Sequence, residues 1–229
     1  MRMDGLRSGK HSMNERIERR DAAYRAGETA LLLVDMQRIW LEPGLDPSHP
    51  DRPADHYFYT ETRDRVIPNA SRLLADARKN GIEVIHTIIR SLTRDGRERS
   101  LDHKLTPIHL SPDDDRARIV DELYPSDDEI VLPKTSSGVF NSTNLNYILR
   151  NIGIRFLVVA GIVTDQCVDM AVRDGADLGY AVTCVSDACA APTAARHAAA
   201  LEAFGGYCWI ANTETVSARF RKMTHRSPR

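Results

Sequence analysis

Apolar runs alternate with amphipathic stretches along most of the chain. The runs at 30–34 and 156–160 are continuously apolar, which is typical of strands buried on both faces of a sheet. The stretches between such runs are helix-like, and Ser142 or Thr143 is the expected N-cap of one of them. Because strand and helix alternate, the pattern predicts a three-layer α/β/α sandwich around a mostly parallel sheet. The predicted strands are 29–36, 82–89, 128–134, 154–161, 180–188 and 207–214, and the predicted helices are 67–81, 142–153, 166–179 and 193–206.

Two segments do not fit this alternation. Residues 40–62 contain four prolines and the aromatic sequence HYFY, and residues 91–118 are dense in charged side chains. Long irregular segments in a compact domain are usually functional loops or oligomer contacts, and the sequence leaves both open. Residues 1–28 alternate in charge and are expected to form an N-terminal arm, which leaves residues 29–229 as a single domain.

Composition and charge narrow the class of partner. The 31 lysines and arginines are balanced by 32 acidic residues, so no positive excess favours nucleic acid or anionic lipid, and a small molecule is the expected partner. No stretch reaches the roughly 18 apolar residues of a membrane span. The first 28 residues lack the apolar core of about 7 to 15 residues of a signal peptide, so we expect a cytoplasmic protein.

Three chemically useful side chains stand at or just beyond the ends of predicted strands: Asp35, Lys134 and Cys167. In open α/β sheets, ligands bind beyond the carboxyl ends of the strands. A buried carboxylate needs a partner, and Lys134 could supply it to Asp35. The predicted helix start and a nearby ammonium would both favour the Cys167 thiolate, so its pKa is expected to lie below the ordinary value of about 8.5. Asp35 could then act as general base and general acid.

The stretches LLLVDMQ, VLPKTSSGVF and VVAGIVTDQCVDMAVRDGADLGYAVTCVSDACA carry a family resemblance. Over about residues 29–215 the chain resembles the isochorismatase-like cysteine hydrolases, which include nicotinamidases, N-carbamoylsarcosine amidase, and ureidoacrylate, biuret and triuret hydrolases. The resemblance implies the isochorismatase-like fold and a catalytic triad of Asp35, Lys134 and Cys167. It also implies a cis peptide at Ile162–Val163 and an oxyanion hole formed by the N–H groups of Val163 and Cys167. The implied reaction is attack of the thiolate on an amide carbonyl, loss of ammonia or an amine, and hydrolysis of the thioester.

The remaining cysteines and the acidic residues beside Cys167 have simpler interpretations. Cys184, Cys189 and Cys208 lack CxxC or metal spacing and are expected to be reduced core thiols. Asp165 and Asp169 are expected to cap the helix that follows. A small buried core residue is also the alternative interpretation of Cys167 itself.

The nicotinamidases of this family carry a metal site in a D-W-H-type segment after the second strand. The corresponding sequence here is HTIIRSLTRDGRERS, without such a cluster, so we expect no metal, no cofactor and no nicotinamidase activity. His86 falls inside a predicted strand and is expected to be a core histidine. His103, His109 and His197 are too scattered to predict a metal site.

Candidate pocket residues follow the same strand ends. The hydroxyl and amide side chains after Lys134 could hydrogen-bond a carbamoyl group, and an aromatic ring could stack on its plane. Arg90 could bind a substrate carboxylate or form a surface ion pair, and Phe140 could equally be ordinary packing. The predicted substrate-binding residues are Gln37, Trp40, Arg90, Thr135, Ser137, Phe140 and Asn141.

The sequence thus predicts a metal-independent cysteine amidohydrolase acting on a small ureide, carbamoyl compound or related linear amide of the triuret, biuret or ureidoacrylate type. The alternatives are an isochorismatase that cleaves a vinyl ether, and a catalytically silent oligomeric interaction domain. A homo-oligomer, dimer or tetramer, is expected. Ile17, Ala22, Ala23 and Tyr24 of the arm could dock on a neighbouring subunit, and HYFY would add exposed apolar surface.

Overall fold

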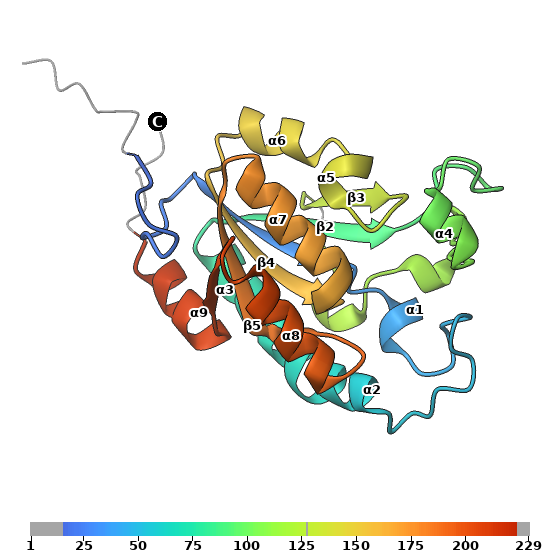
Figure 1. Cartoon of the computed structure of the whole chain (residues 1–229). Helices are drawn as coiled ribbons and strands as arrows, with labels where there is room; N and C mark the ends of the chain where they lie inside the picture. The colour runs from blue at the N-terminus through green and yellow to red at the C-terminus, as the bar shows by residue number, and fades with distance from the viewer. Residues whose placement is uncertain (1–15, 127, 224–229) are drawn as a thin grey trace, which may run out of the picture.

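The computed structural model describes residues 16–126 and 128–223. Within these residues the chain forms six strands and a set of helices that alternate with them (Figure 1). The strands are β1 (Thr29–Val34), β2 (Glu83–Ile89), β3 (Ile130–Lys134), β4 (Phe156–Ile162), β5 (Ala181–Ala190) and β6 (Trp209–Ala211). The α-helices are α1 (Arg38–Leu41), α2 (Tyr57–Glu61), α3 (Ile67–Lys79), α4 (Leu101–Leu105), α5 (Val139–Ser142), α6 (Leu145–Asn151), α7 (Asp169–Asp177), α8 (Ala194–Phe204) and α9 (Thr213–Arg221). Shorter turns of π- or 3₁₀-helix are η1 (Thr62–Val66), η2 (Asp115–Ala117), η3 (Asp121–Leu123) and η4 (Thr164–Val168).

The described strands form one sheet in the order β3-β2-β1-β4-β5-β6, with every neighbouring pair parallel. The strand order reverses direction between β1 and β4, so these two central strands flank a topological switch point. In open α/β sheets the crevice beyond such a point is where ligands bind. The fold therefore directs attention to the residues that follow β1 and β4.

Two hydrophobic layers hold the sheet between helices. Leu31 and Leu33 of β1 point into the layer formed with α3 and α9, whereas Leu32 and Val34 point into the layer formed with α5 to α8. This alternation follows from the period of two along a strand, and it requires β1 to be apolar at every position. The predicted three-layer α/β/α sandwich is confirmed.

The element boundaries differ from the prediction at two places. The helix expected over 142–153 is α6, which begins only at Leu145, and Ser142 instead ends the separate short helix α5. The N-cap of α6 is Asn144, so the expectation of Ser142 or Thr143 is wrong, although the Thr143 hydroxyl accepts a hydrogen bond from the Leu145 N–H. The strand expected over 207–214 ends at Ala211, and α9 follows it. The Asn212 side chain caps α9 by accepting from the Thr215 N–H.

The aromatic sequence HYFY is not an exposed insertion. Its last three residues begin α2, which continues through η1 into α3, and Phe58 and Tyr59 are buried in the core. The expectation that this segment leaves apolar surface exposed is therefore wrong, because the helix turns its aromatic side chains inward.

The part of the predicted arm that the structure describes, 16–28, packs on the chain's own domain. Tyr24 is buried, donates a hydrogen bond to Thr183 Oγ1 at 2.9 Å, and packs its ring against Phe156 and Phe220. Ile17 and Ala22 lie against the same core. Tyr24 is thus committed within the chain and is not free to dock on a neighbouring subunit. Residues 1–15 of the arm lie outside the described residues. No helix in 16–126 or 128–223 is long and apolar enough to cross a membrane.

Candidate active site

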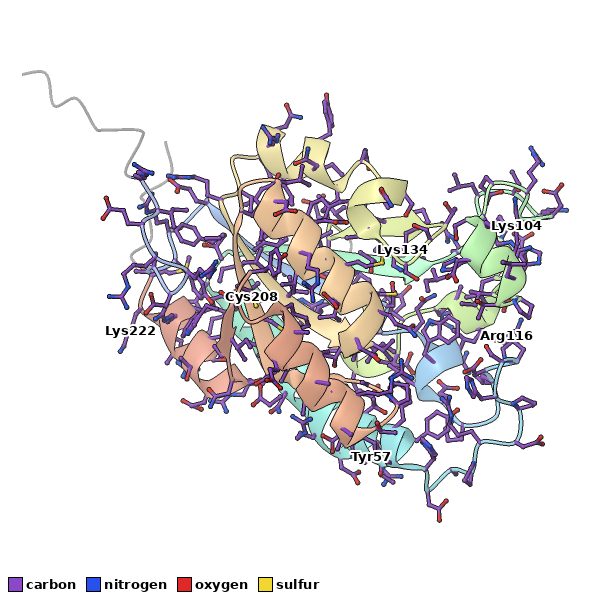
Figure 2. All side chains as sticks on the ribbon, in the orientation of Figure 1. Tyr57, Lys104, Arg116, Lys134, Cys208 and Lys222 are labelled. Carbon is purple, nitrogen blue, oxygen red and sulfur yellow. The ribbon has the colours of Figure 1, made fainter. Side chains whose placement is uncertain are left out.

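Asp35, Lys134 and Cys167 meet at the carboxyl edge of the sheet. Asp35 directly follows β1, Lys134 is the last residue of β3, and Cys167 lies in η4, the helical turn after β4. Asp35 has a φ of 54°, an unusual backbone conformation that turns the chain sharply out of the strand. Figure 2 labels Lys134 at the end of β3, on the side of the molecule that carries α4.

Lys134 connects the other two side chains. Its Nζ lies 2.8 Å from Asp35 Oδ2 and 3.3 Å from Cys167 Sγ. The same nitrogen donates to the backbone oxygens of Ser136 at 3.0 Å and Ser137 at 3.2 Å. Lys134 has no exposed surface, and a buried ammonium is tolerated only where acceptors surround it in this way.

Thr87 of β2 holds the carboxylate in place. Its hydroxyl donates to Asp35 Oδ1 at 2.8 Å, while the Asp35 N–H bonds the Thr87 carbonyl oxygen at 3.1 Å. One carboxylate oxygen thus accepts from Thr87 and the other is paired with Lys134. The sequence analysis missed Thr87, which reads simply as a strand residue.

Burial decides the protonation of Cys167. Burial raises the pKa of Cys167 to about 12, because the opposing effect of the Lys134 charge is smaller and Asp35 adds to the rise. Burial also acts to lower the pKa of Lys134, but Asp35 and Cys167 together outweigh it, so this pKa is raised and the lysine stays charged. The expected pKa of Cys167 below its ordinary value is therefore wrong for the resting site, where the thiol is protonated beside a carboxylate.

The turn between β4 and Cys167 has an unusual backbone. The Ile162–Val163 peptide bond is cis. Gly161 has a φ of 127°, and a Cβ there would overlap the backbone of Val34 in the neighbouring strand. Glycine at this position lets β1 and β4 approach closely where both strands end.

A pocket of about 220 Å³ opens onto Asp35 and Cys167. Of the residues predicted from the sequence, Trp40, Ser137 and Val163 also line it. Its volume is below the roughly 300–1,000 Å³ of pockets for drug-sized ligands, so it suits a small molecule.

The isochorismatase domain family matches residues 29–215 of the chain. The chain belongs to this family. Among curated relatives, a ureidoacrylate amidohydrolase of Serratia proteamaculans is 31% identical over 215 residues, covering 84% of this chain and 83% of the relative. A protein of Arabidopsis thaliana named a probable inactive nicotinamidase is 33% identical over 184 residues, covering 77% of this chain and 88% of the relative. The crystal structure of a cysteine hydrolase from Pseudomonas syringae superposes with a TM-score of 0.76 at 25% identity, over 87% of this chain and 95% of that one.

Several predicted binding residues of this isochorismatase-family chain do not line the pocket. Gln37 is fully buried, and its side chain bonds the Ile89 N–H at 2.8 Å and the carbonyl oxygens of Ile89 and Ala117 at 3.0 and 2.8 Å. Its polar atoms therefore hold the backbone together instead of facing a ligand. Arg90 lines a separate groove, together with residues of the 112–119 segment.

The residues after Lys134 are similarly divided. Phe140 does not line the pocket, and its ring stacks on Tyr180 with ring centroids 6.1 Å apart. Of the two interpretations of Phe140, ordinary packing therefore holds. Asn141 is exposed, and Thr135 is likewise absent from the pocket wall. Only Ser137 of this run reaches the pocket, because α5 turns the following side chains toward α7.

Much of the wall comes from residues that the sequence analysis did not single out. The 40–62 segment and the 91–118 segment both contribute side chains to the pocket wall. Short stretches after Cys167 complete the pocket. The additional lining residues are Asp46, Ser48, His49, Arg52, Phe58, Ile89, His103, Thr106, Ile108, Gln166, Pro192 and Arg196, and Ile162 of the predicted cis peptide lines the pocket with them.

Asp165 and Asp169 do not cap the helix after Cys167. Asp165 pairs with Arg196 of α8, and Asp169 pairs with Arg173 one turn along α7. Both carboxylates are used in ion pairs, so the expectation of side-chain caps is wrong.

Within 16–126 and 128–223, no group of three or more His, Cys, Asp or Glu side chains is arranged to hold a metal ion. His86 is a buried histidine of β2, as expected; its Nε2 lies 3.0 Å from Glu129 Oε2, while its Nδ1 has no hydrogen-bond partner among the described residues. Cys184, Cys189 and Cys208 are buried free thiols, as expected.

Proposed function

We propose that this protein is a metal-independent cysteine amidohydrolase that acts on a small ureide, carbamoyl compound or related linear amide and releases ammonia. The observation that carries the proposal is the contact of Lys134 Nζ with both Asp35 and Cys167 at the floor of a small pocket. A lone buried cysteine would need neither partner. Two relatives add support, because one is named a ureidoacrylate amidohydrolase and another is described as a cysteine hydrolase.

The first half of the reaction uses Asp35 as the base. Because the resting thiol has a raised pKa, the Cys167 proton must be taken as the sulfur attacks, and Asp35 is the carboxylate beside it. The Lys134 ammonium stabilises the negative charge on sulfur as it forms. The sulfur bonds to the carbonyl carbon, and the carbonyl oxygen becomes an oxyanion.

The backbone N–H groups of Val163 and Cys167 are the proposed oxyanion donors, and both residues line the pocket. One such donor typically contributes roughly 2.7 to 4 kcal/mol to transition-state stabilisation. As the carbon–nitrogen bond breaks, Asp35 returns its proton to the leaving nitrogen, so ammonia departs and an S-acyl enzyme remains.

Hydrolysis of that intermediate reverses the proton transfers. Asp35 takes a proton from water, the hydroxide oxygen bonds to the acyl carbon, and the carbon–sulfur bond breaks with return of a proton to sulfur. With a ureide, the product is a carbamic acid, which decomposes to an amine and carbon dioxide. The cycle consumes one water and leaves Asp35, Lys134 and Cys167 unchanged.

The experiment that tests this function measures ammonia release from a panel of ureides, N-carbamoyl acids and simple amides. Turnover of at least one compound is expected, with loss of at least about 10³-fold in Cys167→Ser and in Asp35→Asn. An ammonia signal that survives Cys167→Ser unchanged would rule out the mechanism. A second candidate function, a catalytically silent domain, is favoured by the relative named probably inactive, and it requires that no amide on the panel is hydrolysed.

A homo-oligomer remains part of the proposal, although neither Tyr24 nor HYFY supports it. Leu101 and Leu105 lie one turn apart on α4 and are 71% and 75% exposed, which leaves an apolar face for a second copy of the chain. Sedimentation at micromolar concentration should show a dimer or tetramer. Leu101→Lys together with Leu105→Lys should shift it toward monomer, and a parent protein that sediments as a monomer would overturn this part.

A further inference from the structure

Arg52 is an arginine in the pocket wall that lacks a hydrogen-bonding partner. Its side chain is 11% exposed, and its guanidinium donates no hydrogen bond to any residue in the described part of the chain. The guanidinium carbon lies 5.7 Å from the ring centroids of both Phe58 and Tyr59. These rings fix the position of the planar group while leaving its N–H donors available.

The nearest carboxylate does not use those donors. Asp46 Oδ2 lies 3.9 Å from Arg52 Nη1, which is too far for a hydrogen bond. Asp46 is instead satisfied within its own loop, where Oδ1 accepts from the Ser48 N–H and hydroxyl and Oδ2 lies 3.1 Å from His49 Nδ1. Asp46 therefore offsets part of the Arg52 charge without occupying its donors.

The other charges around the pocket are also paired. Asp35 is neutralised by Lys134, and Arg196 is paired with Asp165. Among the described residues of the pocket wall, Arg52 is thus the arginine whose guanidinium donates no hydrogen bond, and a guanidinium with so little exposed surface and no hydrogen bonds is costly unless a ligand completes them.

His103 provides a second, independent sign of a polar ligand. It lines the same pocket and is 1% exposed, and neither of its ring nitrogens has a hydrogen-bond partner. Unpartnered buried polar groups are rare in folded proteins, and those facing a pocket are completed by ligand or water. The guanidinium of Arg52 and the ring nitrogens of His103 are therefore both without hydrogen-bond partners in the wall of one pocket.

We propose that Arg52 binds the carboxylate of the substrate and that the natural substrate is an N-carbamoyl or ureido acid, in preference to a neutral ureide. The proposal rests on the proposed function, because it places the carbamoyl group at Cys167. The planar guanidinium offers two parallel N–H donors, which match the two oxygens of a carboxylate. Neutral compounds such as biuret offer no carboxylate to these N–H donors, and Asp46 would then be the carboxylate nearest to the Arg52 charge.

Binding to the Cys167→Ser protein tests the proposal without any need for turnover. N-carbamoylglycine and N-carbamoyl-β-alanine, each compared with its methyl ester, are titrated by calorimetry. At least one acid should bind roughly 10- to 100-fold more tightly than its ester. Adding Arg52→Met should remove this preference and leave the binding of the ester within about twofold. Adding Arg63→Met, which removes an exposed arginine outside the pocket, should leave the preference intact.

Turnover of the same compounds by the protein with Cys167 intact gives the second readout. Arg52→Met should raise KM for the acid with little change in kcat, and Arg52→Lys, which keeps the charge but loses the planar fork, should fall between parent and Arg52→Met. Equal binding of acid and ester, or equal losses for both in Arg52→Met, would overturn the assignment even if ammonia release still depends on Cys167. Failure of the proposed function would look different, because an acid preference dependent on Arg52 would persist in binding without ammonia release.

Discussion

The sulfur of Cys167 and the ammonium nitrogen of Lys134 lie 3.3 Å apart, and the lysine has no exposed surface. At this separation the positive charge acts directly on the protonation of the thiol. Burial nevertheless dominates and raises the pKa of Cys167 to about 12. Lys134 therefore limits the rise in pKa without reversing it, and for this reason the proposed mechanism requires Asp35 to remove the proton when substrate is bound.

Replacement of Lys134 by methionine should raise the pKa of Cys167 further. Burial already raises this pKa, and the variant loses the charge that opposes it. Alkylation of Cys167 by iodoacetamide, followed by mass spectrometry against pH, should climb through pH 10 in the parent and be slower in Lys134→Met at every pH. Lys134→Met also leaves the Asp35 carboxylate without its ion-pair partner. The double variant Lys134→Met with Asp35→Asn removes that carboxylate charge and so serves as the control. Identical pH curves with and without Lys134 would show that its charge does not act on the thiol.

Removal of divalent metal should leave activity unchanged. The proposed mechanism uses side chains and backbone N–H groups for every step, and the described residues contain no metal-binding cluster. Once a substrate is known, dialysis against a strong chelator should alter kcat/KM by less than about twofold. A large loss that zinc or iron restores would contradict the prediction.

Replacement of Gln37 by leucine should destabilise the fold without acting on the pocket chemistry. The variant leaves the Ile89 N–H and the carbonyl oxygens of Ile89 and Ala117 without their side-chain partner in a buried site. We expect a loss of about 2 to 4 kcal/mol in the free energy of unfolding, measured by urea denaturation. Asn141→Ala is the matched control, because that side chain is exposed and should change stability by less than about 0.5 kcal/mol. Equal effects of the two variants would contradict the structural role of Gln37.

Glu129 should make the protein sensitive to acid. Burial acts to raise the pKa of Glu129, but hydrogen bonds from Arg78 and His86 outweigh it and lower the pKa to about 2. The pKa is lower in the folded state, so this stabilisation is present above about pH 4.5 and is lost as the pH falls toward 2. At pH 7, Glu129→Gln should have a free energy of unfolding about 1 to 2 kcal/mol lower than the parent. Between pH 5 and 2, the free energy of unfolding of the variant should fall less steeply than that of the parent. If the free energies of unfolding of the two proteins fell in parallel over that pH range, Glu129 would not be the source of the acid sensitivity.

The central fold and the triad could be predicted from the sequence because both depend on local patterns. Continuous apolar runs identify buried parallel strands, and the carboxyl ends of such strands meet at one edge. The strand ends identified Asp35, Lys134 and Cys167 as candidates, and the family resemblance implied that they form a triad. Thr87 was missed because a threonine inside a strand is ordinary, and only the pairing of β2 beside β1 shows that its hydroxyl reaches Asp35.

The pocket walls could not be predicted in the same way. Gln37 is two residues from Asp35, yet the sharp turn at Asp35 directs it to Ile89 and Ala117, and sequence proximity carries no information about that direction. Arg52 and His103 lie in segments whose paths are set by tertiary contacts, with no repeating pattern to identify the inward side chains. The irregular segments themselves were recognisable, but their individual residues were not.

The proposed chemistry and the proposed selectivity of this protein occupy separate parts of the chain. The residues of the proposed triad lie at or next to the ends of β1, β3 and β4, and the close approach of Gly161 to Val34 leaves β1 and β4 little freedom to change. Arg52 lies between α1 and α2 and His103 lies in α4, and these elements lie outside the sheet (Figure 1). Mutations can therefore remodel the connections while the reacting groups keep their positions. Such a division suits the evolution of new substrate preferences, and a library restricted to 46–58 and 100–108 is the economical place to select for them.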